Sequence, residues 1–518
     1  MIKPWQGALD QARKAAEADD GIALHAAIDA LLRRWANHHD AVLDAAALLL
    51  SIGELGRAEA LLQLCHQLNP GANAPLINLA TVWQQSLRQN EALALDEALA
   101  RQQPGDSRLL SKALTALAYR NGATAQSNQH LALRWAESLA PAPASPPQKR
   151  GDRLPLRIGL LSADLCQHPV GLFLLPLAQG LSRRENVELV FYDNSPRRDW
   201  LSEELQRCGR WQAIQQLDHD ALAATIARDQ LSVLLELGGH TAGSRLAVLQ
   251  RRPAPCQLSW LGYWGTTGLR NSVDGVLVDP LVVPPGSAEA ESFVEPLIWL
   301  PQSRWVYRPV PWMPEPVEPP CLRRGFITFG SFNNAAKLSA ELLRCWTNLL
   351  KVVPHSRLRL KNYQLRDPQL RQRIAALIAA EGINADRLEL EGPSFHQNLL
   401  ASYGDVDIAL DTFPFTGGLT SCEALWMGLP LVSLAQNNRA AVMAARQGQA
   451  LLALINRDPW IAESTSDYVR IAAELASSPE LLREVRSSQR ERMLASPLCD
   501  EEGFCEAMIT SLQRCCWG

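Results

Sequence analysis

Short apolar segments that alternate with amphipathic helical segments constrain the fold of this chain more than any other feature. Between residues 156 and 279 each of them ends in Gly, Asp, Asn or Ser; they are 156–164, 187–195, 231–239, 256–265 and 274–279. Apolar residues fill both faces of these segments, which is typical of strands in a parallel sheet covered by helices. The sequence therefore predicts a doubly wound α/β domain over residues 156–312.

A second series of the same kind follows a proline-rich stretch at 308–320. Its predicted strands are 326–332, 356–362, 387–392, 405–413 and 429–434. We assign this series to a second domain, over residues 321–518, and expect the helix after Pro497 to cross back to the first domain. Two such Rossmann-like domains place a cleft between the carboxyl ends of their strands, where ligands bind in folds of this kind.

Residues 1–140 have helical periodicity, with much Ala, Leu and Gln. Pro70 and Pro104 lie 34 residues apart and close two similar segments that begin at Ala58 and Ala92. This period is that of tetratricopeptide helix pairs, so we predict an all-α region of degenerate repeats; the alternative is an irregular helical bundle. A segment rich in Pro, Ala and Ser at 141–155 is typical of a linker.

Composition excludes several classes of protein. The 518 residues include 50 Lys and Arg against 54 Asp and Glu, a formal net charge of -4, so we expect no nucleic-acid partner. No segment reaches the ~20 apolar residues that cross a bilayer, and the N-terminal residues lack the apolar core of a signal peptide. The eleven cysteines form no CxxC pair, which favours reduced thiols and a cytoplasmic protein without membrane insertion.

The strongest local signal for a binding site is the segment 411–434, in which a strand end is followed by a Gly-Gly turn and a helix start. Glycines let the backbone approach a ligand, and the N–H groups and dipole of a helix start attract phosphate. The donor-binding candidates are Gly417, Gly418, Thr420, Ser421 and Glu423, with the glutamate suited to a ribose hydroxyl. The alternative is an ordinary Ser/Thr helix cap.

A lysine after a strand is the second signal. Lys337 follows the Asn333–Asn334 pair in FGSFNNAAKLS, where its charge could neutralise a diphosphate leaving group. In isolation a solvated surface lysine is the alternative.

Two histidines form the third signal, because each follows a predicted strand of the first domain. His168 could accept a hydroxyl proton or position a donor, and His240, in LGGHTAGSRL, lies in a similar place. For both, the alternative is a structural histidine bonded to backbone.

An Asp-Val-Asp triplet at Asp405 and Asp407 matches the short motif that holds a divalent metal in some glycosyltransferases. Here it opens an apolar strand, and three-residue motifs match by chance too often, so we expect no metal. The phosphate-binding GxxxxGK[ST] loop, the dinucleotide-binding GxGxxG motif and the GxSxG nucleophile elbow are missing from the strand ends, which disfavours kinases, dehydrogenases and hydrolases.

Taken together, these segments resemble the O-linked N-acetylglucosamine transferase family, including its bacterial members. The similar stretches are LRIGLLSADLCQHPVG, GGHTAGSRL, RPAPCQLSWLGYWGTTG, FGSFNNAAKLS, VDIALDTFPFTGGLTSCEALWMGLP and ASPLCD, in the same order from about residue 155 to the C-terminus. The resemblance implies a GT-B arrangement of two facing Rossmann-like domains behind tetratricopeptide repeats. It also implies inverting, metal-independent transfer of N-acetylglucosamine from UDP-N-acetylglucosamine to Ser or Thr of an acceptor protein, without a cofactor.

The resemblance also implies roles for single residues. Lys337 is similar to the lysine that stabilises the leaving diphosphate, and Asn334 to a residue on the uridine and phosphate side. Gly418, Thr420 and Glu423 fall on the loop and helix that bind phosphate and ribose, and His168 falls on the active-site histidine.

Three departures lie near the donor side. Leu399 stands where the family usually has a histidine, and Trp264 stands where relatives have a proline. The segment 435–448 differs from its counterpart and retains an arginine, Arg439, as a further candidate. These departures leave two alternatives open: a UDP-glucose-dependent asparagine glucosyltransferase of the same fold, or a repeat-bearing binding protein with weakened catalysis.

Overall fold

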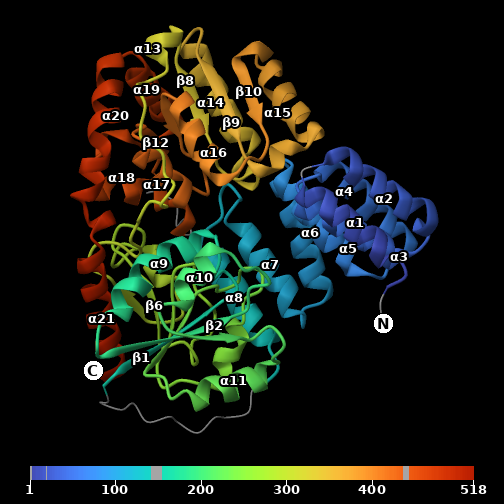
Figure 1. Cartoon of the computed structure of the whole chain (residues 1–518), viewed down its shortest axis with the longest axis vertical. Coiled ribbons are helices and arrows are strands. Elements are labelled where there is room, and N and C mark those ends of the chain that lie inside the picture. The colour runs from blue at the N-terminus through green and yellow to red at the C-terminus, as the bar shows by residue number, and fades with distance from the viewer. Residues whose placement is uncertain (1–2, 19, 142–153, 436–442, 518) are drawn as a thin grey trace.

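The computed structural model describes residues 3–18, 20–141, 154–435 and 443–517. An all-α region at the N-terminus precedes two α/β domains, which lie one above the other in Figure 1 with the first helices to one side. This is the predicted fold class. Most of the predicted linker, at 142–153, lies outside the described residues.

Eight helices form the N-terminal region and pack mostly against their neighbours in sequence, as repeats do. They are α1 (Gln6–Glu17), α2 (Gly21–Trp35), α3 (His39–Ser51), α4 (Leu55–Leu68), α5 (Asn73–Gln85), α6 (Gln89–Gln102), α7 (Ser107–Leu117) and α8 (Ala125–Ser138). The two similar segments become α4 and α6, each 14 residues long, with Ala58 and Ala92 buried between helices. Both similar segments are therefore helices of equal length, which is consistent with the predicted repeats.

The first sheet has seven parallel strands in the order β3-β2-β1-β4-β5-β6-β7. Its strands are β1 (Leu156–Ser162), β2 (Val187–Asp193), β3 (Arg210–Ala213), β4 (Val233–Glu236), β5 (Gln257–Ser259), β6 (Gly275–Val278) and β7 (Leu297–Trp299). Its helices are α9 (Pro169–Ser182), α10 (Trp200–Gln206), α11 (His219–Arg228) and α12 (Ala288–Glu291). All five predicted strands are present, but β5 is shorter than predicted, because Leu261 has a φ of 77° and turns the chain.

The second sheet has six parallel strands in the order β10-β9-β8-β11-β12-β13. They are β8 (Thr328–Ser331), β9 (Arg357–Lys361), β10 (Leu388–Glu391), β11 (Ile408–Leu410), β12 (Leu431–Leu434) and β13 (Ile461–Ala462). The helices are α13 (Cys321–Arg324), α14 (Ala340–Val352), α15 (Pro368–Ala380), α16 (His396–Ala401), α17 (Leu419–Trp426), α18 (Gln447–Leu454), α19 (Thr465–Ala476), α20 (Pro479–Leu494) and α21 (Glu501–Trp517).

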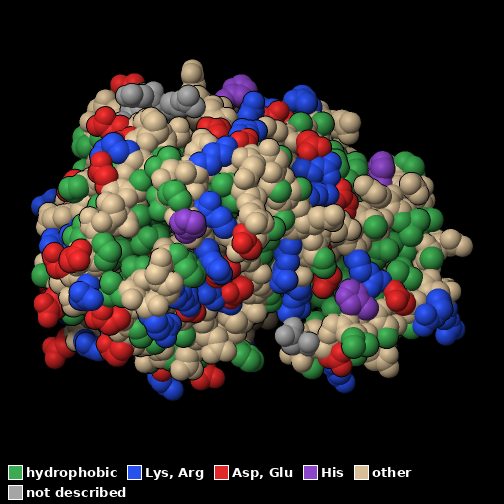
Figure 2. All heavy atoms as spheres, turned by 90° about the horizontal axis from the view of Figure 1, so that it is seen from above, with side chains coloured by type: hydrophobic (Ala, Val, Ile, Leu, Met, Phe, Trp, Pro, Cys, Tyr) green, Lys and Arg blue, Asp and Glu red, His purple; other side chains and the backbone are tan. Residues whose placement is uncertain are grey.

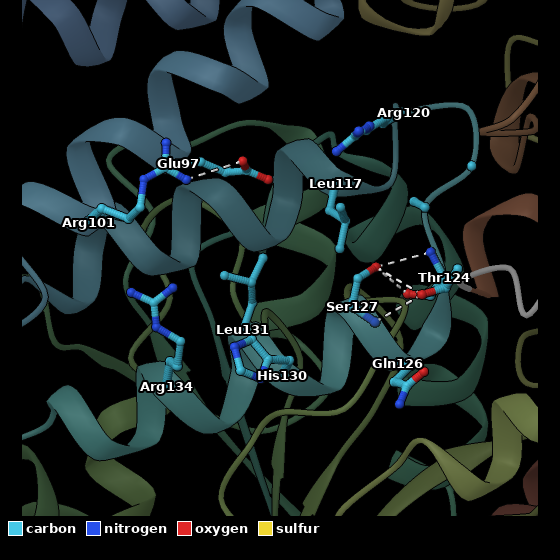
Figure 3. A pocket seen from close by; sticks show the side chains of 13 residues that line it. Glu97, Arg101, Leu117, Arg120, Thr124, Gln126, Ser127, His130, Leu131 and Arg134 are labelled. Carbon is cyan, nitrogen blue, oxygen red and sulfur yellow. Dashed lines mark hydrogen bonds and ion pairs between the residues drawn. The ribbon is translucent and has the colours of Figure 1, made fainter.

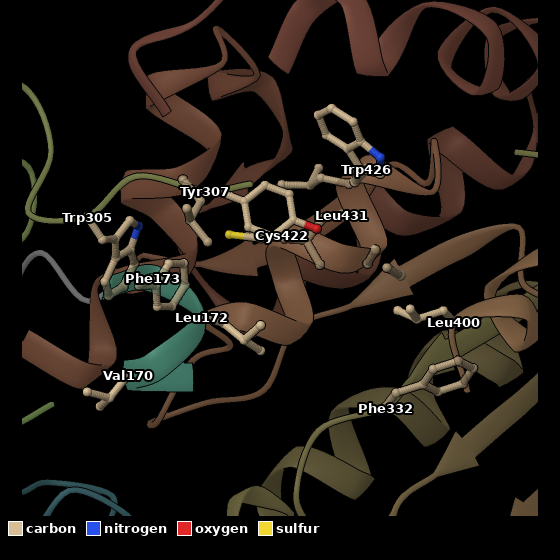
Figure 4. Packing of buried hydrophobic residues seen from close by; sticks show 14 of the residues in the cluster. Val170, Leu172, Phe173, Trp305, Tyr307, Phe332, Leu400, Cys422, Trp426 and Leu431 are labelled. Carbon is tan, nitrogen blue, oxygen red and sulfur yellow. The ribbon is translucent and has the colours of Figure 1, made fainter. Parts of the chain in front are cut away.

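Buried aromatic side chains join the two α/β domains (Figure 4). Phe173 of α9 stacks on Trp305 with ring centroids 4.9 Å apart, and Tyr307 meets Trp426 of α17 at 5.9 Å. Such pairs contribute about 0.5–1.5 kcal/mol beyond the area they bury. The Tyr307 N–H also donates to the carbonyl of Leu498 at 2.8 Å, so the segment that leaves the first sheet is bonded to the segment before α21.

The C-terminal helix α21 returns to the first domain, as predicted. It runs beside α9, where the Cys505 thiol lies close to Gly180, and Arg308 pairs with Glu501. In Figure 1 the red helices α20 and α21 follow one edge of both domains. The two sheets are therefore tied together at two places, by the connecting segment and by this helix.

The N-terminal region contacts both α/β domains. Its Gly56 N–H donates to Asp367 at 2.8 Å, and the Gln89 amide donates to the carbonyl of Ala336 at 3.2 Å. On the other side, Asn128 of α8 donates to the Tyr263 hydroxyl at 3.0 Å. The helical region thus supports the segment that carries Lys337 and also packs on the first domain.

The outer surface carries mixed charge. Lys and Arg side chains are interspersed with Asp and Glu over the face seen in Figure 2. Among the described residues no helix is long and apolar enough to cross a membrane.

Candidate active site

Lys337 points into the loop that precedes α17. It ends a short 3-10 helix at Ala335–Lys337, after β8, and its Nζ donates to the carbonyl of Thr416 at 2.8 Å. The ammonium also lies 4.2 Å from the ring centroid of Phe415. Burial lowers the pKa of Lys337 to about 8, and the carboxylate of Asp411 acts against that shift. This half-buried lysine is not a solvated surface residue, so the structure disfavours that alternative.

Asp411 shapes the loop from beneath. Its buried carboxylate accepts hydrogen bonds from the Gly417 N–H at 2.6 Å and from the Ser433 hydroxyl at 2.7 Å. Burial raises the pKa of Asp411 to about 6. A Cβ on Gly417 would lie 2.1 Å from the Ser421 hydroxyl oxygen, so only glycine fits here. The Gly417 N–H is therefore bonded to Asp411, and the Ser421 hydroxyl lies against this glycine.

The start of α17 presents unused hydrogen-bond donors. Gly418 is its N-cap residue and has no side chain to cap the helix, and within the described chain the N–H groups of Gly418, Leu419 and Thr420 have no acceptor. The Thr420 hydroxyl donates to Asn333 Oδ1 at 3.0 Å. Helix starts of this kind attract anions through their dipole and open N–H groups.

Asn333 joins the lysine to the helix start, which sequence reasoning did not predict. Its Oδ1 accepts from Thr420 and lies 3.4 Å from Lys337 Nζ. The neighbouring Asn334, the predicted residue, is exposed and uses its side chain to cap the 3-10 helix through the Ala336 N–H at 2.9 Å. The structure thus brings Lys337 and Thr420 together through the buried asparagine of the pair.

Glu423 is part of α17 and is hydrogen-bonded to His396, a histidine that the sequence analysis did not predict. His396 Nε2 is 3.2 Å from the Glu423 carboxylate, and His396 Nδ1 accepts from the Trp312 indole at 3.3 Å. Because Nδ1 is an acceptor, the proton lies on Nε2 and is donated to Glu423. His396 lies one helical turn before Leu399 on α16. Because Leu399 stands where the family usually has a histidine, a search for a nearby histidine in the sequence could have found His396.

His168 lies at the first sheet. It caps α9, and its Nδ1 accepts from the Val170 N–H at 3.3 Å. Burial lowers the pKa of His168, with Arg197 adding to the shift and Asp164 opposing it, so the ring is neutral at pH 7. This neutral ring carries its proton on Nε2 and is set to donate rather than to accept.

The two halves of the site meet through α9. Phe173, one turn after His168, stacks on Trp305, and a Cβ on Gly418 would lie 3.9 Å from the Trp305 ring. The helix that His168 caps therefore packs beside the start of α17. Helix α9 and the start of α17 thus lie against the same tryptophan, Trp305.

His240 has a different environment. It is buried, its Nε2 lies 3.0 Å from the Thr267 carbonyl, and its Nδ1 lies 3.2 Å from the Ser111 hydroxyl of α7. Burial lowers its pKa to about 3. With both ring nitrogens bonded within the protein, the geometry favours the structural alternative for His240.

Three aromatic residues from different parts of the chain surround the lysine loop. Phe415 is 4.7 Å from the ring of Trp264, in the first domain, and 4.9 Å from Tyr119, after α7. Trp264, the departure from the family pattern, is therefore part of the wall beside Lys337. Arg439 and the surrounding segment 436–442 lie outside the described residues.

The Asp-Val-Asp triplet supports the second sheet. Asp407 is buried and accepts from the N–H groups of Cys321 at 2.9 Å and Thr328 at 2.8 Å. Asp405 pairs with Arg359 at 3.3 Å. Both carboxylates are thus engaged by protein groups.

The chain has two all-parallel α/β domains, and a lysine and an uncapped helix start lie together where strands of the second sheet end. This combination is typical of the GT-B class of glycosyltransferases. Residues 119–308 and 321–508 match the model of glycosyl transferase family 41. The chain therefore belongs to glycosyl transferase family 41.

Comparison with individual proteins agrees with this assignment. The chain is 36% identical over 374 residues to a rice protein (Oryza sativa subsp. japonica) named as a probable UDP-N-acetylglucosamine–peptide N-acetylglucosaminyltransferase, SPINDLY; the match covers 71% of this chain and 39% of the relative. It is 30% identical over 373 residues to the similarly named SEC of Arabidopsis thaliana, covering 69% of this chain and 37% of the relative. This chain thus matches about two fifths of the length of these curated relatives.

A solved structure resembles the whole chain. The O-GlcNAc transferase of Thermobaculum terrenum, solved as a mutant, has a TM-score of 0.86 and 30% sequence identity, and the match covers 100% of this chain and 99% of that one. The arrangement of the helical region with the two α/β domains is therefore shared with that protein.

Proposed function

We propose that this protein is an inverting, metal-independent glycosyltransferase that moves N-acetylglucosamine from UDP-N-acetylglucosamine to Ser or Thr hydroxyls of an acceptor protein. One observation supports the proposal: Asn333 Oδ1 bonds both the ammonium of Lys337 and the hydroxyl of Thr420, at a helix start whose N–H groups at Gly418, Leu419 and Thr420 have no acceptor among the described residues. A diphosphate matches that set of donors in charge and in hydrogen bonding.

In the proposed reaction the oxygen of the acceptor hydroxyl attacks the anomeric carbon, and the bond from that carbon to the diphosphate breaks on the opposite side. The hydroxyl proton is released to solvent as the new carbon–oxygen bond forms. The electron pair leaves with UDP, so negative charge grows on the diphosphate as the bond lengthens. Lys337 and the α17 N–H groups meet that charge where it develops, which is the arrangement that lowers a barrier rather than only binding substrate. His168 positions the reacting groups by donating from Nε2.

The nucleoside is proposed to lie over Glu423. Its carboxylate is buried and holds one hydrogen bond from His396, and a carboxylate has further lone pairs that a ribose hydroxyl can use. The bond from Trp312 fixes the ring of His396 and thereby the direction of this carboxylate. Asn334, which is exposed at the same edge, remains a predicted contact on the uridine side.

The names of similar proteins support the donor and the acceptor. The rice and Arabidopsis relatives are named for UDP-N-acetylglucosamine and peptide, and the solved relative is named an O-GlcNAc transferase. Because the curated matches cover only part of the relatives, sugar and acceptor are proposals for this chain. We further propose that the protein works in the cytoplasm, because none of its eleven cysteines, all within the described residues, forms a disulfide.

A panel of nucleotide sugars tests this function. UDP release is measured with UDP-N-acetylglucosamine and with UDP-glucose, and mass spectrometry locates the sugar on peptides that carry Ser, Thr or Asn. The proposal predicts N-acetylglucosamine on Ser or Thr. Glucose on Asn would support the asparagine glucosyltransferase instead, and no release or binding of any donor would support a repeat-bearing binding protein.

A further inference from the structure

A cavity of about 600 Å³ lies in the helical region, away from the lysine loop. Figure 3 shows that side chains from α6, from the turn after α7 and from α8 surround it. Four of its lining residues are basic: Arg101, Arg120, His130 and Arg134. We propose that this cavity binds an acidic segment of the acceptor polypeptide, an inference that rests on the proposed transferase function.

The charge of the cavity is largely uncompensated. Among the described residues Glu97 is the one carboxylate that lines it, and it pairs with Arg101 at 3.7 Å. In the part of the chain that the structure describes, no carboxylate pairs with Arg120 or Arg134. Two guanidinium groups therefore face the same space with their donors unused, and guanidinium groups bind carboxylates through paired hydrogen bonds.

The rest of the lining suits a polypeptide. Apolar side chains of Leu117 and Leu131 lie between the basic groups, and Thr124 and Gln126 add polar groups at one end. An Asp or Glu side chain on a peptide can place its methylene groups against the apolar part and its carboxylate against an arginine. A protein segment with several such residues uses the whole cavity, whereas a single small anion uses only one corner.

The position of the cavity connects it with the active site. The face of α8 that carries Ser127, His130 and Arg134 lines the cavity, while the opposite face carries Asn128, which bonds to Tyr263 of the first domain. At the other end, Arg120 directly follows Tyr119, whose ring lies against Phe415 in the lysine loop.

The same turn is also tied to the second domain, because the amide of Asn121 donates to Glu341 at the start of α14. The turn that lines the cavity is therefore held between the lysine loop and the second domain, so we infer that an acceptor polypeptide with its serine at Lys337 extends over this turn to the cavity. Acidic residues on one side of the modified serine would be held there.

Binding of matched peptides tests the proposal. One peptide carries a serine and a cluster of Asp and Glu, and its counterpart carries Asn and Gln in the same places; fluorescence anisotropy measures their affinity for the full chain. We expect the acidic peptide to bind about fivefold to tenfold more tightly, with the difference shrinking at high salt. The double variant Arg120→Gln and Arg134→Gln should remove this preference.

Two single variants sharpen the result. Glu97→Gln removes the competing carboxylate, so it should strengthen binding of the acidic peptide by about twofold. Arg33→Gln changes one exposed arginine outside the cavity and should leave the preference unchanged. A series of peptides that shifts the acidic cluster along the chain should show one preferred distance from the serine in transfer assays.

UDP titration of the same variants separates the two proposals. Failure of the unmodified chain to bind UDP would overturn the transferase function, independently of the peptide result. If UDP binds normally but both peptides bind equally, or if the double variant keeps the preference, the acidic-segment proposal is wrong. Displacement by inorganic phosphate without any preference for the acidic peptide would likewise overturn it.

Discussion

The two α/β domains share a parallel, doubly wound plan but use the polar groups at their strand ends differently. In the first domain, Glu236 is buried after β4 and accepts from the N–H groups of Gly238 at 3.0 Å and Gly239 at 2.8 Å, and burial raises its pKa to about 7. His240 has both ring nitrogens bonded within the protein. These groups hold loops in place.

In the second domain, the strand ends leave donors available. The N–H groups at the start of α17 have no acceptor within the described chain, and the ammonium of Lys337 lies near them, with a carbonyl and an amide oxygen as its hydrogen-bond acceptors. Two domains with the same fold can therefore differ in whether the polar groups at their strand ends are available to a ligand. We propose that the second domain meets the charge of the donor, while the first domain contributes His168.

The largest expected effect comes from removing Lys337, the cation that the described residues place at the second domain's site. Lys337→Met keeps the length of the side chain and loses its charge, so turnover with saturating donor and acceptor should fall by about 10²- to 10³-fold. Initial rates of sugar transfer measure this. The matched control is Lys351→Met, on the exposed side of α14, where the rate should stay within twofold.

A rate for Lys337→Met near that of the unmodified chain would contradict the proposed role of the second domain in donor chemistry. The donor chemistry would then have to lie elsewhere. Circular dichroism of both lysine variants establishes that they are folded.

Substitution of His168 tests how much the first domain contributes to turnover. In His168→Asn the amide oxygen can still cap α9, but the Nε2–H is lost, so we expect turnover to fall about tenfold with little change in UDP affinity. Kinetics and UDP titration together measure this split. Equal loss of both quantities would make His168 a donor-binding residue and would weaken the contrast between the domains.

The pH profile gives a smaller, graded effect. Burial lowers the pKa of Lys337 to about 8, so the ammonium is charged below that pH and is lost as the pH rises through it. We expect kcat/KM to be level near pH 7 and to fall above pH 8, approaching tenfold per pH unit. Lys337→Arg stays charged throughout this range, so its profile should lack that fall.

His240 should affect stability rather than chemistry. His240→Leu leaves the Ser111 hydroxyl and the Thr267 carbonyl without their buried partner, so we expect a loss of about 1–3 kcal/mol in the free energy of unfolding. Thermal and denaturant unfolding measure it, and UDP affinity should be unchanged. Reduced UDP affinity in a fully folded variant would assign His240 to the donor site after all.

The sequence predicted the larger elements of both sheets and missed their edges. The strands β3, β7 and β13 were not predicted, because segments as short as RWQA, LIW and IA have too few residues to show a pattern. The repeats were predicted from the spacing of Pro70 and Pro104, which reflects a local rule for ending helices.

Within the site, residues next to a strand end could be predicted and their partners could not. Lys337 and Thr420 follow recognisable segments, but Asn333 joins them across 87 positions of sequence, and His396 reaches Glu423 across 27. Such contacts depend on how the elements pack. For the same reason the sequence did not show that the Gly417 N–H is already bonded to Asp411.

Titration of UDP into the unmodified chain and into Lys337→Met, followed by calorimetry, tests most directly whether a diphosphate is held between this lysine and the start of α17. We predict that the unmodified chain binds UDP but binds uridine much more weakly, and that Lys337→Met lowers UDP affinity at least about tenfold. Equal affinity of the two proteins for UDP, or no binding of millimolar UDP by the unmodified chain, would contradict the account.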